Sequence, residues 1–256
     1  MSETAHCQGV QRRERSRPSM RAAISVIVLS TALLLALSAG CDIAAPPQVS
    51  EKVTGMEFQT PAVLPVPLLP KDGLRFCIAI DPGHGGEGNP GCVFGDAMEK
   101  DLNLFLAFML RDVLEDMGYR VVLTRTDDTP VDLPDRPVLA LAENADIFIS
   151  IHHNSQENGI DATGIETLYN DGASPRNPSL AASVQKATID ATQAVDRGTK
   201  VRNELAVLTM EDLPACLVEV GFLSSPEERA LLVTDNYRSK LARGIARGID
   251  EFLSGN

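Results

Sequence analysis

A chain of 256 residues with 44% hydrophobic content can bury one substantial core once roughly its first 70 residues are set aside. Its formal net charge of -12 excludes the nucleic-acid-binding classes, whose phosphate ligands require a basic face. It has no tryptophan and only 4% aromatic residues, which excludes a binding surface built on stacked aromatic rings.

The first segment has the order expected of an export signal. A basic stretch with five arginines (Arg12, Arg13, Arg15, Arg17 and Arg21) precedes an apolar run over residues 22–39. The segment resembles a bacterial lipoprotein signal with Ser38-Ala39-Gly40-Cys41 as its lipobox, although Ser38 stands where that pattern usually has leucine. The resemblance implies that residues 1–41 are a signal peptide and that Cys41 carries a lipid. Met20 is an alternative start, and an uncleaved membrane anchor is the alternative to cleavage.

A proline-rich segment follows the signal. Residues 42–73 contain six prolines, which cannot donate to a regular hydrogen-bond ladder, and we expect a semi-rigid spacer there. The remaining residues, 74–256, form a single predicted domain. Because residues 1–41 carry five arginines and two glutamates, the rest of the chain carries a net charge of -15. An acidic domain beside anionic lipids should be held off the membrane surface, outside the cytoplasm.

Three cysteines remain in the predicted domain. Cys77 and Cys216 lie in apolar runs and are expected to be buried apolar side chains. Together with Cys92 they make an odd number, which in an oxidising compartment allows at most one internal disulfide. Their spacing does not match a cysteine zinc site.

Within the domain, apolar strand-like runs alternate with helical patterns. Strands are expected at residues 75–81, 119–124, 146–152, 164–169 and 214–222. Helices are expected at residues 101–117, 134–144, 178–194, from 226 onward, and at 237–253. This alternation predicts an α/β fold: a single three-layer domain with a mostly parallel twisted sheet covered by helices on both faces.

The start of the helix after the last strand carries its own signal. Ser225 is expected at the N-cap and Pro226 at the first helical position. Glu228 is expected to close a capping box with Ser225.

Histidine and carboxylate side chains follow or precede the predicted elements at one edge of the sheet. His84 comes after the first strand in an Asp-Pro-Gly-His-Gly-Gly loop, Glu99 precedes the first helix, and His152 and His153 end the third strand. Histidine nitrogen and glutamate oxygen are ordinary zinc ligands, and a catalytic zinc needs three of them. Strand alternation places His152 on the face of Phe148 and Ser150, with His153 pointing the other way, so only one of the pair should bind the same metal.

Glu219 lies among apolar residues near the end of the last predicted strand. A carboxylate in such surroundings has a raised pKa unless a charged group holds it, which suits a general acid–base. The alternative is a structural ion pair with an arginine at the sheet edge. Glu99 has a similar alternative, because charged clusters before helices are common.

Four separated motifs resemble the zinc-dependent N-acetylmuramoyl-L-alanine amidases of the Amidase_3 type. They are Ile80-Asp81-Pro82-Gly83-His84-Gly85-Gly86, Glu99-Lys100 with Asn103-Leu104, Ser150-Ile151-His152-His153-Asn154, and Glu219-Val220-Gly221-Phe222-Leu223. The resemblance covers about residues 75 to 253 and makes 74–256 an amidase catalytic domain. His153 departs from the family pattern, because most relatives have a small residue at this position. At low pH a protonated His153 beside the metal ligands could weaken metal binding.

The resemblance implies roles for individual residues. It implies that His84, Glu99 and His152 bind Zn²⁺ and that Glu219 is the catalytic carboxylate. Glu166 matches a family glutamate near the site and is counted with Glu219 as a catalytic residue. The implied reaction cleaves the amide between N-acetylmuramic acid and the L-alanine of the peptidoglycan stem peptide. The expected protein is a monomer that acts on peptidoglycan, binds no nucleic acid and is held to the membrane by its lipid.

Two other functions remain open from the sequence. A zinc peptidase that cuts within the stem peptide would use similar ligands on a similar sheet, and analysis of the products separates it from an amidase. An inactive wall-binding domain is the non-enzymatic alternative, and a zinc assay separates it from both enzymes.

Overall fold

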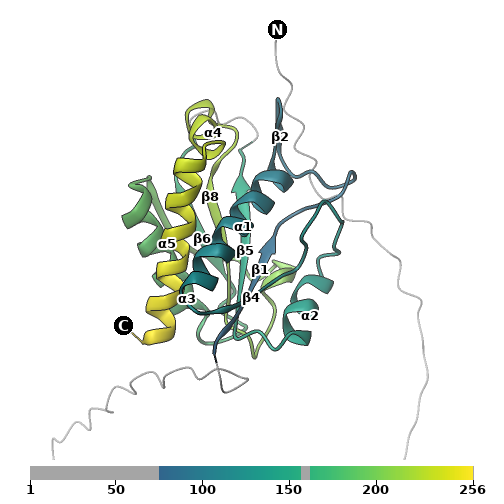
Figure 1. Cartoon of the computed structure of the whole chain (residues 1–256), viewed down its shortest axis with the longest axis vertical. Coiled ribbons are helices and arrows are strands. Elements are labelled where there is room, and N and C mark those ends of the chain that lie inside the picture. The colour runs from purple at the N-terminus through teal and green to yellow at the C-terminus, as the bar shows by residue number, and fades with distance from the viewer. Residues whose placement is uncertain (1–74, 157–161, 256) are drawn as a thin grey trace, which may run out of the picture. The chain divides into compact units, whose positions relative to one another are not determined.

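A computed structural model describes residues 75–156 and 162–255 of the chain. The predicted signal peptide, the spacer and Cys41 lie outside the described residues. In chain order the elements are β1 (Cys77–Pro82), β2 (Val93–Phe94), β3 (Ala97–Met98), α1 (Glu99–Asp116), β4 (Arg120–Leu123), α2 (Asp135–Ala142), β5 (Ile147–Asn154), β6 (Ile165–Tyr169), α3 (Asn177–Thr192), β7 (Asp196–Val201), the 3-10 helix η1 (Ala206–Leu208), β8 (Ala215–Phe222), α4 (Pro226–Leu232) and α5 (Asp235–Ser254) (Figure 1). Within the described ranges, no helix is long and apolar enough to cross a bilayer.

Six strands form the main sheet, in the order β4-β1-β5-β8-β6-β7. β4, β1, β5 and β8 run parallel to one another, β6 runs antiparallel to β8, and β7 is parallel to β6. The prediction of a mostly parallel sheet is therefore confirmed. The carboxyl ends of β1, β5 and β8 meet at one edge, where open α/β sheets place their ligands.

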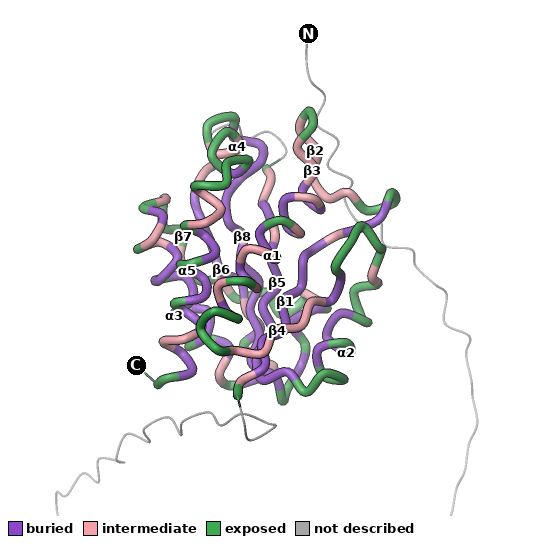
Figure 2. Tube along the Cα trace, viewed as in Figure 1, coloured by how far each residue is buried: buried purple, intermediate pink, exposed green. Residues whose placement is uncertain are grey.

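Helices cover both faces of this sheet, as predicted. Ile78 and Ile80 of β1 join a core shared with α1, α3 and α5, whereas Cys77 and Ala79 join a second core beneath α2 and η1 (Figure 1). Successive side chains of a central strand therefore enter two different cores, which is why these strands are apolar on both faces. Figure 2 shows the buried backbone concentrated along these strands. Cys77 and Cys216 are both buried, as expected, and face opposite sides of the sheet, so they do not pair with each other.

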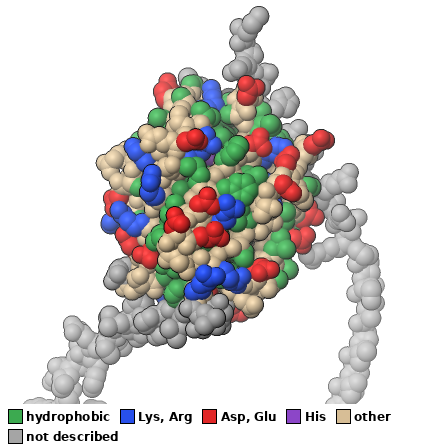
Figure 3. All heavy atoms as spheres, in the orientation of Figure 1, with side chains coloured by type: hydrophobic (Ala, Val, Ile, Leu, Met, Phe, Trp, Pro, Cys, Tyr) green, Lys and Arg blue, Asp and Glu red, His purple; other side chains and the backbone are tan. Residues whose placement is uncertain are grey.

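The outer surface mixes charges of both signs. On the face that carries α1 and α5, Figure 3 shows apolar side chains interspersed with acidic and basic ones. Phe105 of α1 contributes to the exposed apolar surface, and the guanidinium of Arg238 lies 5.5 Å from the centroid of its ring.

Four elements were not expected from the sequence: β2, β3, β7 and the 3-10 helix η1. β7 is a polar and mostly exposed edge strand, and the two-residue strands β2 and β3 form a small hairpin before α1. A polar sequence carries no alternating apolar signal, so only pairing with β6 reveals β7. α1 begins at Glu99, two residues earlier than expected, which places this carboxylate in the first turn of the helix.

The capping prediction is half correct. Ser225 is the N-cap of α4, and its Oγ accepts a hydrogen bond from the backbone N–H of Glu228 at 3.3 Å. The expected return bond from Glu228 to Ser225 is wrong, because the backbone N–H of Ser225 donates to Phe222 instead. The carboxylate of Glu228 accepts from Phe222 N at 2.6 Å and from Gly164 N at 2.7 Å. It therefore ties the end of β8 to the start of β6.

Two glycines of α5 allow close packing against α3. A Cβ at Gly248 would lie 2.5 Å from Cα of Val184, and a Cβ at Gly244 would lie 2.7 Å from Cα of Thr188. Both obstacles are backbone atoms of α3, which cannot swing aside as a side chain can. The separation of the two helices therefore depends on these two glycines.

We expect Gly248→Ala to destabilise the domain. Alanine improves helix propensity by up to about 1 kcal/mol, but overpacking against a backbone costs about 1–3 kcal/mol or more, so the clash should win. Thermal and urea unfolding measure the change. Gly88→Ala is the control, because a Cβ there meets nothing within 4 Å. Equal stability of Gly248→Ala and the parent chain would contradict the packing argument.

Candidate active site

Three predicted ligands meet at the carboxyl ends of β1 and β5. His84 Nε2 lies 3.0 Å from Glu99 Oε1, and His152 Nδ1 lies 2.9 Å from the same oxygen. One ligand atom from each of the three residues lies within 4.8 Å of the others. The imidazole rings meet edge to face, with centroids 4.9 Å apart. A cluster of two imidazoles and a carboxylate in this space can hold a metal ion.

Glycines make room for this cluster. A Cβ at Gly83 would overlap the imidazole ring of His152, so no larger residue fits beside that ring. A Cβ at Gly91, which has φ of 70°, would lie 2.5 Å from Glu99 Oε2. The loop between β1 and α1 therefore wraps both ligands closely. His84 itself has φ of 62°, a left-handed conformation that is costly outside glycine.

Buried side chains hold the His84 loop in that conformation. Arg136 donates from Nη1 to the carbonyl of Pro82 at 2.9 Å and from Nη2 to that of His84 at 2.7 Å. Arg125 and Asn103 both donate to the carbonyl of Gly83, at 3.0 Å and 3.1 Å. Three consecutive carbonyls are thus held by side chains from three parts of the fold.

Arg136 is in turn held by Asp81. Its Nη1 lies 2.8 Å from Asp81 Oδ1, and both side chains are only 1% exposed. Thr124 and Ser150 also donate to the carboxylate of Asp81, at 2.6 Å and 2.7 Å. A buried charge pair is tolerated when its remaining hydrogen-bonding capacity is filled, which is the case here.

The electrostatics of the cluster keep Glu99 anionic. Burial raises its pKa, but hydrogen bonds from His152 and His84, together with their charges, hold the pKa well below its usual value. Backbone N–H groups of Cys92 and His153 also donate to it, at 2.9 Å and 3.3 Å. Burial lowers the pKa of His84, yet contacts with Glu99 and Asn89 outweigh it and raise the pKa overall. The donor set therefore fits a divalent cation, since an anionic oxygen lies between two imidazole nitrogens.

His153 points away from the cluster, as strand alternation predicts. It is buried on the α1 side of the sheet, where its Nδ1 lies 2.7 Å from Asn103 Oδ1. Burial lowers its pKa to about 4, so the ring is neutral at ordinary pH. It therefore does not act as a flanking cation at neutral pH.

Glu219 is near the cluster on the neighbouring strand. It pairs with His152 in the register of β5 and β8. Its Oε2 is buried and has no hydrogen-bond partner among the described residues. Burial, followed by the negative charges of Glu99 and Glu166, raises the pKa of Glu219 well above its usual value. A carboxyl group whose protonated form is stabilised in this way is suited to accepting a proton and returning it.

Glu166 lies opposite Glu219 but in a different environment. The antiparallel register of β6 and β8 pairs the two residues directly. Arg197 donates to Glu166 Oε2 at 2.7 Å, Lys200 donates to the same oxygen, and Asn154 donates to Oε1 at 3.2 Å. Burial raises the pKa of Glu166, but Lys200 and Arg197 lower it overall. Glu166 therefore remains charged beside Glu219.

Residues 78–251 match the family Amidase_3, N-acetylmuramoyl-L-alanine amidase. The chain belongs to this family. It is 35% identical over 177 residues to the uncharacterized protein YqiI of Bacillus subtilis strain 168, covering 68% of this chain and 84% of that protein. It is 37% identical over 177 residues to the sporulation-specific N-acetylmuramoyl-L-alanine amidase of the same strain, covering 68% of this chain and 67% of that protein.

A solved structure agrees with this placement. The crystal structure of an N-acetylmuramoyl-L-alanine amidase from Clostridium difficile 630 is 39% identical, with a TM-score of 0.67. The match covers 70% of this chain and 97% of that one. The likeness therefore extends over most of this chain and nearly all of that amidase.

Sequence reasoning missed several residues around the site of this Amidase_3 chain. Arg136 had one available signal, because a basic residue in the first turn of a helix opposes the helix dipole and needs another reason to be there. Arg197 and Lys200 had none, since they lie on the unexpected strand β7. Asn103 was part of a family motif, but its bonds to Gly83 and His153 come from the structure.

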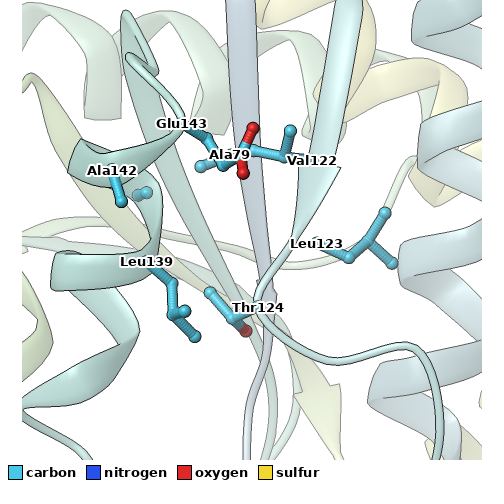
Figure 4. A pocket seen from close by; sticks show the side chains of 8 residues that line it. Ala79, Val122, Leu123, Thr124, Leu139, Ala142 and Glu143 are labelled. Carbon is cyan, nitrogen blue, oxygen red and sulfur yellow. The ribbon is translucent and has the colours of Figure 1, made fainter.

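One hollow in the surface of the Amidase_3 domain lies away from the His84–Glu99–His152 cluster. It occupies about 150 Å³ between β4 and α2, where Leu139 and Ala142 of the helix lie across from Val122 of the strand and Thr124 after it (Figure 4). None of the three clustered residues lines it. Its size alone therefore does not make it the active site.

Proposed function

We propose that this protein hydrolyses the amide bond between the lactyl group of N-acetylmuramic acid and L-alanine in peptidoglycan. The observation that supports this most directly is the placement of Glu219, with its raised pKa and buried unpaired oxygen, on the strand beside the His84–Glu99–His152 cluster. Family membership supports the choice of bond.

The proposed metal ligands are His84, Glu99 and His152, and the proposed metal is zinc. Two imidazoles and a carboxylate are a ligand set known from catalytic zinc sites. Zinc bound there would polarise a carbonyl and lower the pKa of a water molecule. The chain's own contribution is the rigid placement of the ligands through Arg136, Arg125 and Asn103.

Glu219 is the proposed general acid–base. It takes a proton from the water that attacks the carbonyl carbon. As the carbon–nitrogen bond breaks, it returns that proton to the departing nitrogen of L-alanine, which leaves a free amine and a lactyl carboxylic acid that keeps the second proton of the water. Glu166, kept charged by Arg197 and Lys200, helps to hold the pKa of Glu219 high.

The residues before the catalytic domain have a proposed role in localisation. We propose that residues 1–41 are an export signal ending at a lipid-bearing Cys41, that residues 42–73 are a spacer and that 74–256 is the catalytic domain. The protein then acts outside the cytoplasm as a membrane-anchored monomer. This proposal rests on the basic, apolar and proline-rich order of the N-terminal sequence.

The full chain, loaded with zinc, should release intact stem peptides from purified peptidoglycan. A chelator should stop the release and added zinc should restore it, because the proposed chemistry requires the metal. Mass spectrometry identifies the products, and stem peptides cut internally would support a zinc peptidase instead.

His84→Ala and His152→Ala should each lose stoichiometric zinc. His153→Ala is the matched control and should keep its zinc, because that ring faces α1.

Glu219→Gln should lower the rate of peptide release by about 10²–10⁴-fold, the usual contribution of a general acid–base group. Zinc content should be unchanged, and the melting temperature should be unchanged or higher, because a buried carboxylate is costly to keep. A lower melting temperature with full activity would instead make Glu219 a structural residue. Loss of zinc together with activity would make it a metal ligand.

Cys41→Ser should abolish incorporation of a radiolabelled fatty acid and release the protein from the membrane fraction, because it removes the proposed lipid attachment site. Cys92→Ser is the control and should remain labelled. Unchanged labelling of Cys41→Ser would contradict lipid attachment at Cys41, and an unlabelled variant that stays in the membrane fraction would favour an uncleaved anchor.

A further inference from the structure

A small cavity adjoins the two histidines of the cluster. It occupies about 110 Å³ and is bounded on one side by His84 and His152. Its other walls include apolar side chains from the loop before α2, from η1 and from β8: Leu133, Ala206, Val207 and Leu217. Val207 and Leu217 are buried, whereas Leu133 is 48% exposed at the rim. The cavity is therefore a distinct recess at the edge of the candidate active site.

The charged residues in its wall already make hydrogen bonds within the protein. Asp81 accepts from Thr124, Ser150 and Arg136. The guanidinium of Arg136 donates to Asp81 and to the carbonyls of Pro82, His84 and Val131. A polar group entering the recess would lose its water without gaining these partners, which is unfavourable. An apolar group would gain from the same burial.

The substrate of the proposed reaction presents a small apolar group on each side of the bond that breaks. The lactyl methyl is attached to the carbon next to the carbonyl, and the alanine methyl to the carbon next to the nitrogen. Each methyl group is therefore attached one carbon away from the scissile amide, and the recess directly adjoins the two histidines of the cluster. We propose that the recess bounded by Leu133, Val207 and Leu217 binds a methyl group flanking the scissile amide and selects substrates that carry it.

This inference rests on the proposed amidase function and adds a specificity site to it. The zinc-loaded full chain can be tested on three synthetic muropeptides. One carries both methyl groups, one lacks the lactyl methyl because a glycolyl ether replaces the lactyl ether, and one has glycine in place of L-alanine. Loss of a methyl group from an apolar pocket should lower kcat/KM by roughly tenfold or more. The wild-type chain should show such a loss for at least one analogue.

Leu133→Ala links the selectivity to the recess. It removes one wall at an exposed position, so the fold should be retained. For the analogue that the wild-type chain discriminates against, the ratio of kcat/KM on the parent muropeptide to kcat/KM on the analogue should fall several-fold towards unity. Leu139→Ala is the matched control. Leu139 is a leucine on α2 with a similar exposure of 43%, but it lines the hollow of Figure 4 and should leave both ratios unchanged. Val207→Ala, checked for its melting temperature, tests the buried wall and should act in the same direction as Leu133→Ala.

The outcomes separate the inference from the function on which it rests. The ratio that falls in Leu133→Ala identifies the methyl group, lactyl or alanine, that occupies the recess. Equal kcat/KM for all three substrates, or ratios that Leu133→Ala and Val207→Ala leave unchanged, would overturn the inference while the amidase function stands. Failure of the zinc-loaded chain to cleave both the parent muropeptide and intact peptidoglycan would instead overturn the proposed function.

Discussion

The candidate active site depends on the buried ion pair between Asp81 and Arg136. Such a pair stabilises a structure only when its other hydrogen bonds are made, and loss of one partner from a buried pair typically costs about 3–5 kcal/mol. Here Thr124 and Ser150 complete the carboxylate, while Arg136 uses its other donors on the loop that carries His84. The buried charge pair therefore fixes Arg136, and Arg136 in turn holds the loop that positions the proposed metal ligand His84. It also explains how His84 is held at a positive φ, which few residues adopt without support.

The pKa values of three glutamates near this loop shift in different directions because their partners differ. Glu99 receives hydrogen bonds from two histidines, and Glu166 receives them from Arg197 and Lys200, so both pKa values are lowered. Glu219 has an unpaired buried oxygen and two anionic neighbours, so its pKa is raised. Groups with pKa values pushed apart by their surroundings can divide the roles of a reaction between them. In the proposed mechanism, Glu99 binds metal and Glu219 moves the proton.

The reversal of strand direction at β6 makes this division of roles structurally possible. An antiparallel strand beside β8 places Glu166 directly opposite Glu219. β7 then adds Arg197 and Lys200 at the exposed edge, where they form ion pairs with Glu166 and keep it charged. The recess next to the histidines lies on the same side of the sheet as α2 and η1, between the loop before α2 and β8. The positions of the charged residues around Glu219 therefore depend on β6 and β7, and the recess depends on η1 and the loop before α2. All of these lie outside the four parallel strands.

The sequence by itself determined the α/β alternation, the cap at Ser225 and the different directions of His152 and His153, because apolar period and strand alternation are local properties of the chain. The family motifs also indicated which residues form the cluster. Only the tertiary structure decided that β7 pairs with β6, that Glu228 binds Gly164 and Phe222 rather than Ser225, and that Arg136 is buried against Asp81. Each of these depends on partners brought together by folding, some of them more than 50 residues apart, as for Arg136 with Asp81 and Glu228 with Gly164. A local pattern does not encode the burial, and hence the electrostatic environment, that such distant partners create.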